Sequence, residues 1–202
     1  MKRLFVALAA AGALMAFTSS APDPLPIGSK LPMANTKVKD VSGKEMELAQ
    51  AAKKNGLLIM FSCNTCPYVI KNQTRTNQIA KFALENNVGV LILNSNEAYR
   101  NGDDSFKAMQ EYAKEQGYNW HYAIDEKSAI ADAFGANRTP ECFLFSKEMT
   151  LVYHGAIDDS PSDESAVQRI HLREAISEMV KGAEVSVKQS KSIGCTIKRK
   201  TS

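Results

Sequence analysis

The stretch LLIMFSCNTCPYVIK, residues 57–71, sets a run of apolar residues directly before two cysteines, Cys63 and Cys66. A short and wholly apolar run predicts a strand buried on both faces, and we predict a central parallel strand here. Pro67 follows the second cysteine, and proline is tolerated in the first turn of a helix because the N–H that it lacks would have no partner there. The sequence therefore predicts that the cysteines lie where a buried strand turns into a helix, which runs to about Asn86.

Patterns of strand and helix alternate along the rest of the chain. A hairpin is predicted around Ser42-Gly43, and the segment 47–56 predicts one or two helical turns closed by Gly56. Further strands are predicted over 88–94, 118–125, 141–146 and 151–157, and further helices over 103–117, 126–135 and 165–182. This alternation favours parallel βαβ units, and the last two strands add an antiparallel hairpin. The predicted fold class is α/β, a three-layer α/β/α sandwich around a central mixed sheet, with an N-terminal β-hairpin extension.

The first residues, MKRLFVALAAAGALMAFTSSAPDP, place two positive charges before an apolar run over 4–17 and small residues after it. This pattern is typical of a secretory signal peptide, cleaved near Ser20 or Ala21. The run is short for a membrane span, which needs about 20 apolar residues, so we expect no stable membrane insertion after cleavage. We expect a periplasmic or extracellular protein. The predicted organisation is a signal peptide over 1–21, one domain over 22–182 and an irregular tail over 183–202.

Composition is that of an ordinary globular chain: 44% of the 202 residues are hydrophobic and 23% are charged. Loss of the leader removes Lys2 and Arg3 and no acid, which lowers the formal net charge from +3 to +1. This near-neutral balance gives no reason to expect a nucleic-acid partner, and the basic end CTIKRK is interpreted as a solvated tail.

Cys63 and Cys66 have the spacing of a redox dithiol. A thiolate is the nucleophile in thiol-disulfide exchange, and a helix N-terminus favours the thiolate form. We expect Cys63, nearer the strand end and solvent, to attack a substrate disulfide, and Cys66, one helical turn later, to resolve the mixed disulfide. The expected partners are protein or small-molecule thiols and disulfides, together with a membrane or periplasmic electron donor that keeps the pair reduced.

The chain resembles the thioredoxin-like superfamily, and within it the redoxin or AhpC/TSA (peroxiredoxin-like) family. The resemblance covers roughly residues 27–198 and rests on the segments FSCNTCPYV, LILNSNEAY, YAIDEKSAIADAFGANRTPECFLF, LVYHGAIDDS and GCTIK. It implies the thioredoxin fold, with Cys63, Cys66 and Pro140 as the redox centre. It also implies that Thr139-Pro140 forms a cis-proline loop that offers backbone groups to an extended substrate, since a cis X–Pro bond costs far less than any other cis peptide.

Two departures from the family bear on the reaction. Peroxiredoxins carry a proline and a hydroxyl residue seven and three positions before the attacking cysteine, where this chain has Gly56 and Met60, so direct peroxidase activity is disfavoured. Thioredoxin carries a buried aspartate six positions before its first cysteine, where this chain has Leu57. Glu97 is the nearest candidate to replace that proton relay, against the alternative that it is a solvated loop acid.

Three further residues are candidate accessories to the dithiol. Arg138 would assist the thiolate electrostatically if it pointed inward. Cys142, two residues after Pro140, is either a small buried side chain or a partner of Cys195. Cys195, in the tail, either pairs with Cys142 or folds back as an extra resolving thiol.

Other readings of the cysteines stay open. Structural zinc sites require four ligands at compatible spacings, and the sequence has no second CxxC pair. Copper-binding relatives use a CxxxC pair and a distant histidine, and His154 is more simply interpreted as a strand-surface residue. We therefore predict an exported thiol-disulfide oxidoreductase with no cofactor and no metal. The alternatives are a thioredoxin-dependent thiol peroxidase, and a non-catalytic or copper- or zinc-binding redoxin-like protein.

Overall fold

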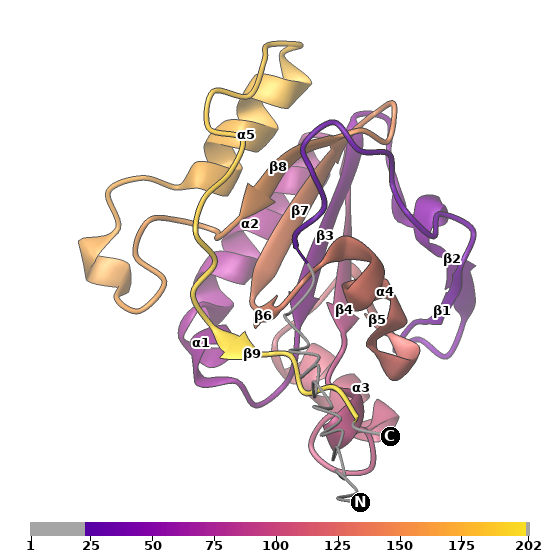
Figure 1. The fold of residues 1–202 in the computed structure, drawn as a ribbon. Helices are drawn as coiled ribbons and strands as arrows, with labels where there is room; N and C mark the ends of the chain where they lie inside the picture. Colours follow the sequence, from indigo (N-terminus) through magenta and orange to yellow (C-terminus); the bar gives the residue numbers. More distant parts are fainter. Residues whose placement is uncertain (1–22, 201–202) are drawn as a thin grey trace, which may run out of the picture.

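A five-stranded mixed sheet in the order β5-β4-β3-β7-β8 forms the centre of the protein (Figure 1). The computed structural model describes residues 23–200, so the predicted signal peptide and its cleavage site lie outside the described residues. Strand β3 is parallel to β4, which is parallel to β5, whereas β7 runs antiparallel to both β3 and β8. The strands span Gly56–Ser62 (β3), Val88–Asn94 (β4), His121–Ile124 (β5), Glu141–Ser146 (β7) and Leu151–Gly155 (β8).

Helices cover both faces of this sheet, as the predicted α/β/α sandwich requires (Figure 1). Side chains of α2, α3 and α5 pack on one face, and side chains of α4 pack on the other. The α-helices span Pro67–Lys71 (α1), Gln73–Glu85 (α2), Phe106–Glu115 (α3), Ala129–Phe134 (α4) and His171–Val180 (α5). Short 3-10 helices span Leu48–Ala51, Glu97–Tyr99, Glu126–Ser128 and Glu164–Ala166.

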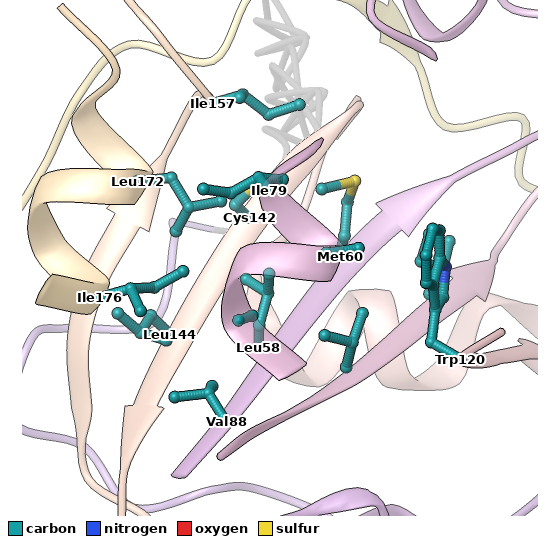
Figure 2. Close-up of a cluster of buried hydrophobic side chains, with 14 of the residues drawn as sticks. Leu58, Met60, Ile79, Val88, Trp120, Cys142, Leu144, Ile157, Leu172 and Ile176 are labelled. Carbon is teal, nitrogen blue, oxygen red and sulfur yellow. The ribbon is translucent and has the colours of Figure 1, made fainter. Parts of the chain in front are cut away.

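Strand β3 is the middle strand of the sheet, and all of its residues are buried. Successive side chains of a strand point to opposite faces. Leu58 and Met60 accordingly join the core beneath α2 and α5, which Figure 2 shows, while Leu57, Ile59 and Phe61 join the core beneath α4. The predicted buried strand is confirmed, and it is paired in parallel on one side and antiparallel on the other.

The N-terminal hairpin is confirmed as β1 (Lys37–Lys39) and β2 (Glu45–Glu47). The single helix predicted to run to Asn86 is two helices, α1 and α2, which divide at Asn72; its side-chain amide donates to the carbonyls of Tyr68 and Pro161. Gly56 closes no helix, because it is the first residue of β3.

The tail departs from the irregular segment that the sequence predicts. Residues Cys195–Thr196 form a short strand, β9, which pairs antiparallel with β6 (Arg138–Thr139), and Figure 1 shows it in yellow beside β6. Within the part of the chain that the structure describes, no helix is both long and apolar enough to cross a membrane. The domain boundaries after residues 21 and 182 stay predictions.

Leu58→Ala is expected to lower the free energy of unfolding by about 2–5 kcal/mol, because a fully buried leucine leaves a cavity when it is truncated. Ile70→Ala, at a side chain that is 56% exposed, is the control and should change stability by less than about 0.5 kcal/mol. Urea unfolding followed by circular dichroism measures both values. Equal losses for the two variants would contradict the assignment of β3 to the core.

Candidate functional site

The dithiol segment lies at the carboxyl end of β3, where the central strand turns into α1. Cys63 follows the last strand residue, and Cys66 is the N-cap of α1, with Pro67 as the first helical residue. Cys66 has an extended backbone with φ −64° and ψ 124°, as an N-cap residue does. The structure therefore puts the cysteines at the strand-to-helix junction that the sequence predicts.

The predicted cis-proline loop at Thr139-Pro140 lies against the two cysteines. The Thr139-Pro140 peptide bond is cis, and Thr139 contacts both sulfur atoms. Its hydroxyl lies 3.6 Å from Cys63 Sγ and its carbonyl oxygen lies 3.3 Å from Cys66 Sγ. The second distance is a contact here because a disulfide sulfur carries no proton, and it becomes a hydrogen bond when Cys66 is a thiol. Cys63, Cys66 and the loop at Thr139 thus form one site.

Cys195 completes this cluster of sulfur atoms. Cys66 and Cys195 form a disulfide across 129 residues, with their Cα atoms 6.0 Å apart, while Cys63 and Cys142 are free. In the pairing of β6 with β9, Cys195 stands opposite Thr139. The alternative that Cys195 pairs with Cys142 is wrong in this structure, because Cys195 is bonded to Cys66 and Cys142 is free.

Cys63 is buried, contrary to the expectation that it faces solvent: only 1% of it is exposed, and 4% of Cys66. Burial raises the pKa of the Cys63 thiol. The Thr139 hydroxyl and the backbone N–H groups of Cys66 and Thr65 act in the opposite direction, since they hydrogen-bond to its sulfur, and the charge of Asp104 adds to the increase. At neutral pH Cys63 is therefore a thiol, and these hydrogen-bond donors would stabilise its thiolate when it ionises.

Asp104 was not singled out by the sequence, yet it holds the dithiol loop. This carboxylate is fully buried and accepts hydrogen bonds from the Asn64 backbone N–H at 2.8 Å and from the side-chain amides of Asn94 and Asn96. The Tyr122 hydroxyl donates to the Asn64 side chain at 2.7 Å. Asp104 thereby fixes Asn64, the first of the two residues between the cysteines. Its only signal in the sequence is its position beside Asp103 at the start of the helix predicted over 103–117.

The two charged accessory candidates lie away from the free thiol. Glu97 accepts from the Lys127 backbone N–H at 3.1 Å and lies 3.6 Å from Arg100, so its partners belong to the neighbouring loops. Arg138 is exposed, and its guanidinium donates to the Gly194 carbonyl and the Thr196 hydroxyl at 3.5 and 3.4 Å. Arg138 therefore holds the tail instead of the thiolate.

His154 is buried, although the sequence favours a strand-surface residue. Its Nε2 lies 2.7 Å from Glu141 Oε1, and the other oxygen of Glu141 accepts from the backbone N–H groups of Asn137 and Arg138. This buried pair supports the turn directly before Thr139. Pattern reasoning missed it because Glu141 and His154 come together only across the pairing of β7 with β8.

Cys142 belongs to the hydrophobic core. It is fully buried on β7, and Figure 2 shows it among Ile79, Leu172 and Ile157. Burial raises the pKa of its thiol far above the usual range, so it stays protonated. Within residues 23–200, no group of three or more His, Cys, Asp or Glu side chains is arranged to hold a metal ion.

Two solved structures resemble the chain over most of its length. One is a hypothetical protein from Sinorhizobium meliloti 1021, with 30% identity and a TM-score of 0.81 over 90% of this chain and 98% of that one. The other is an uncharacterized conserved protein from Geobacillus kaustophilus, with 33% identity and a TM-score of 0.81 over 88% and 94%. A secreted disulfide oxidoreductase of Mycobacterium tuberculosis, homologous to E. coli DsbE, shares the fold at 13% identity, with a TM-score of 0.53 over 74% and 97%.

These likenesses confirm the thioredoxin-like fold that the sequence predicts. Comparison with curated proteins yields no match. The Redoxin family matches residues 26–170, which hold both CxxC cysteines and the cis-proline loop, though not Cys195. By its sequence over that range and by its fold, the chain belongs to the Redoxin family.

Proposed function

We propose that this protein is an exported thiol-disulfide oxidoreductase in which Cys63 attacks and Cys66 resolves. The observation that carries the proposal is the convergence of both sulfur atoms on Thr139 of the cis-proline loop, at 3.6 and 3.3 Å. The hydrogen bonds that the Cys66 and Thr65 N–H groups make to Cys63 supply the stabilisation that an attacking thiolate needs.

In the reducing direction, the Cys63 thiolate attacks one sulfur of a substrate disulfide and expels the other as a thiolate. Cys66 then attacks Cys63 Sγ in the mixed disulfide, the Cys63–Cys66 bond forms, and the second substrate thiol leaves. The substrate gains two electrons and two protons, and the enzyme dithiol loses them. A thiol donor, which we expect at the membrane or in the periplasm, returns the enzyme to the dithiol state.

The peroxidase alternative has less support from the site. Gly56 and Met60 occupy the positions where a peroxiredoxin carries its proline and hydroxyl residue, and both lie inside the buried strand β3. Met60 packs in the core beneath α2. Neither residue offers a hydroxyl to a peroxide, so thiol-disulfide exchange remains the favoured reaction.

The wild-type protein should accelerate the reduction of insulin by dithiothreitol, and Cys63→Ser should fall to the rate of dithiothreitol alone, because the variant lacks the nucleophile. Turbidity of the released insulin B chain measures the rate. Cys142→Ala is the matched control, since that cysteine lies in the core, and it should keep wild-type activity. A wild-type protein that consumes hydrogen peroxide and leaves insulin intact would favour the peroxidase instead.

The rate of Cys63 alkylation should keep rising beyond pH 8.5, where an ordinary cysteine levels off, because burial raises its pKa and only the thiolate reacts. Below the pKa, the rate changes about tenfold for each pH unit. Asp104→Asn removes a charge that raises this pKa, so it should increase the rate at pH 7 severalfold. Iodoacetamide labelling of the fully reduced protein, resolved by peptide mass spectrometry, measures each rate.

Glu97→Gln is the control for this measurement, because Glu97 contacts Arg100 and Lys127 and not the thiol. It should leave the Cys63 profile unchanged. An Asp104→Asn variant that is folded by circular dichroism but keeps the wild-type profile would contradict the electrostatic role of Asp104.

Export is tested by expressing the full chain in a Gram-negative host and separating the periplasm. The mature protein recovered there should lack about the first 20 residues, with its new N-terminus near Ser20 or Ala21. Intact mass spectrometry identifies the cleavage site. A full-length protein that stays in the cytoplasm would contradict the export proposal.

A further inference from the structure

We infer that Cys195 is a third catalytic cysteine, which takes the disulfide from the Cys63–Cys66 pair and carries it to the surface, where a thiol donor reduces it. This inference rests on the dithiol chemistry proposed above. The family match covers residues 26–170, so it does not include Cys195. The structure has the state that this transfer would produce, with Cys66 bonded to Cys195 and Cys63 free.

The tail is held in place before Cys195 by contacts that do not depend on the disulfide. The His154 backbone N–H donates to the Lys188 carbonyl at 3.0 Å, and the Ser190 N–H donates to the His154 carbonyl at 3.1 Å. The Ser190 hydroxyl lies 2.7 Å from the Tyr153 hydroxyl and accepts from the Ala156 N–H. The segment before Cys195 therefore runs along β8 as an added edge.

The tail is also anchored after Cys195. Ile197 is buried, and its N–H donates to the Asn137 carbonyl at 3.1 Å. The Lys198 N–H donates to the Asn96 side chain, and the Lys198 carbonyl accepts from the Ala98 N–H, both at 2.9 Å. Arg199 reaches the Asp132 carboxylate at 2.7 Å. Because contacts lie on both sides, Cys195 remains beside Cys66 when the disulfide is open.

Cys195 is the most exposed of the three cysteines at the site. It is partly exposed, whereas Cys63 and Cys66 are 1% and 4% exposed. A disulfide between Cys63 and Cys66 would be shielded by the docked tail, while a disulfide between Cys66 and Cys195 keeps one sulfur open to an external thiol. When the disulfide moves from Cys63–Cys66 to Cys66–Cys195, an external thiol can reduce it while the tail stays docked.

The transfer balances in electrons and protons. After substrate reduction, the Cys195 thiolate attacks Cys66 Sγ, the Cys66–Cys195 bond forms, and the Cys63–Cys66 bond breaks. Cys63 leaves as a thiolate that the Thr139 hydroxyl and the backbone N–H groups receive, and it takes up the proton that Cys195 gave up. An exogenous dithiol then attacks Cys195 Sγ and releases Cys66, and its second thiol attacks the mixed disulfide on Cys195, which frees Cys195 and closes the donor disulfide.

Gly194 packs closely against the backbone of Thr139. A Cβ at that position would lie 2.2 Å from the Thr139 carbonyl oxygen, a backbone atom that cannot move aside cheaply. Only glycine lets the chain approach Thr139 at the residue before Cys195. The requirement gives a variant, Gly194→Ala, that keeps all four cysteines and disturbs the contact between the tail and Thr139.

The test compares wild type with Cys195→Ser in two measurements on the full mature chain. In a single turnover, each pre-reduced protein should reduce insulin equally, because Cys63 and Cys66 are intact. In steady state at about 0.1 mM dithiothreitol, the variant should be slower than wild type, because dithiothreitol must then attack the disulfide between Cys63 and Cys66, which are only 1% and 4% exposed. Peptide mapping after turnover should find both Cys63–Cys66 and Cys66–Cys195 bridges in wild type.

Gly194→Ala should reproduce the steady-state loss and lower the share of the Cys66–Cys195 bridge. Gly102→Ala is the matched control, since a Cβ there would meet nothing closer than 3.9 Å, and it should behave as wild type. Equal steady-state rates for wild type and Cys195→Ser would overturn the role of Cys195 and leave the proposed function standing. A pre-reduced wild type that fails to reduce insulin in a single turnover would overturn the proposed function itself.

Discussion

The antiparallel pairing of β3 with β7 is the constraint on which the site depends. Phe61 near the end of β3 stands opposite Glu141 at the start of β7, so the residues that follow one strand lie beside the residues that precede the other. Those residues are Cys63 and the Thr139-Pro140 loop, 76 positions apart in the chain. The proposed redox centre is thus a consequence of strand register. The full burial of β3 holds that register, because a slip of one residue would exchange the two faces of its side chains.

Buried polar contacts hold the two loops of the site in place, namely the loop between the cysteines and the turn before Thr139. Asp104 accepts a hydrogen bond from the loop between the cysteines, and the Glu141–His154 pair holds the turn before Thr139. Both are buried, and a buried charged group is costly to leave without partners, so each stays in its hydrogen-bonded arrangement. The cysteines themselves need few direct contacts, since their surroundings fix the loops that carry them.

Most of the sheet and the position of the dithiol follow from local patterns. The apolar runs at 57–62 and 88–94 predict β3 and β4 because strands buried on both faces carry no polar alternation. The break at Asn72 was missed because it depends on the carbonyl of Pro161, which is remote in sequence. Asp104, His154 and the partner of Cys195 were missed or left open for the same reason: each takes its role from a residue that tertiary structure alone brings near.

The pairing of β9 with β6 has a consequence for affinity. Any extended client that pairs with Thr139 competes with residues 195–196 for the same backbone groups. Its apparent dissociation constant is therefore the intrinsic one divided by the fraction of molecules whose tail is undocked. A closed Cys66–Cys195 bond makes that fraction very small, so the protein in that state would bind an extended client weakly before any sulfur chemistry begins. When the bond is open, docking of the tail would still lower the apparent affinity for such a client.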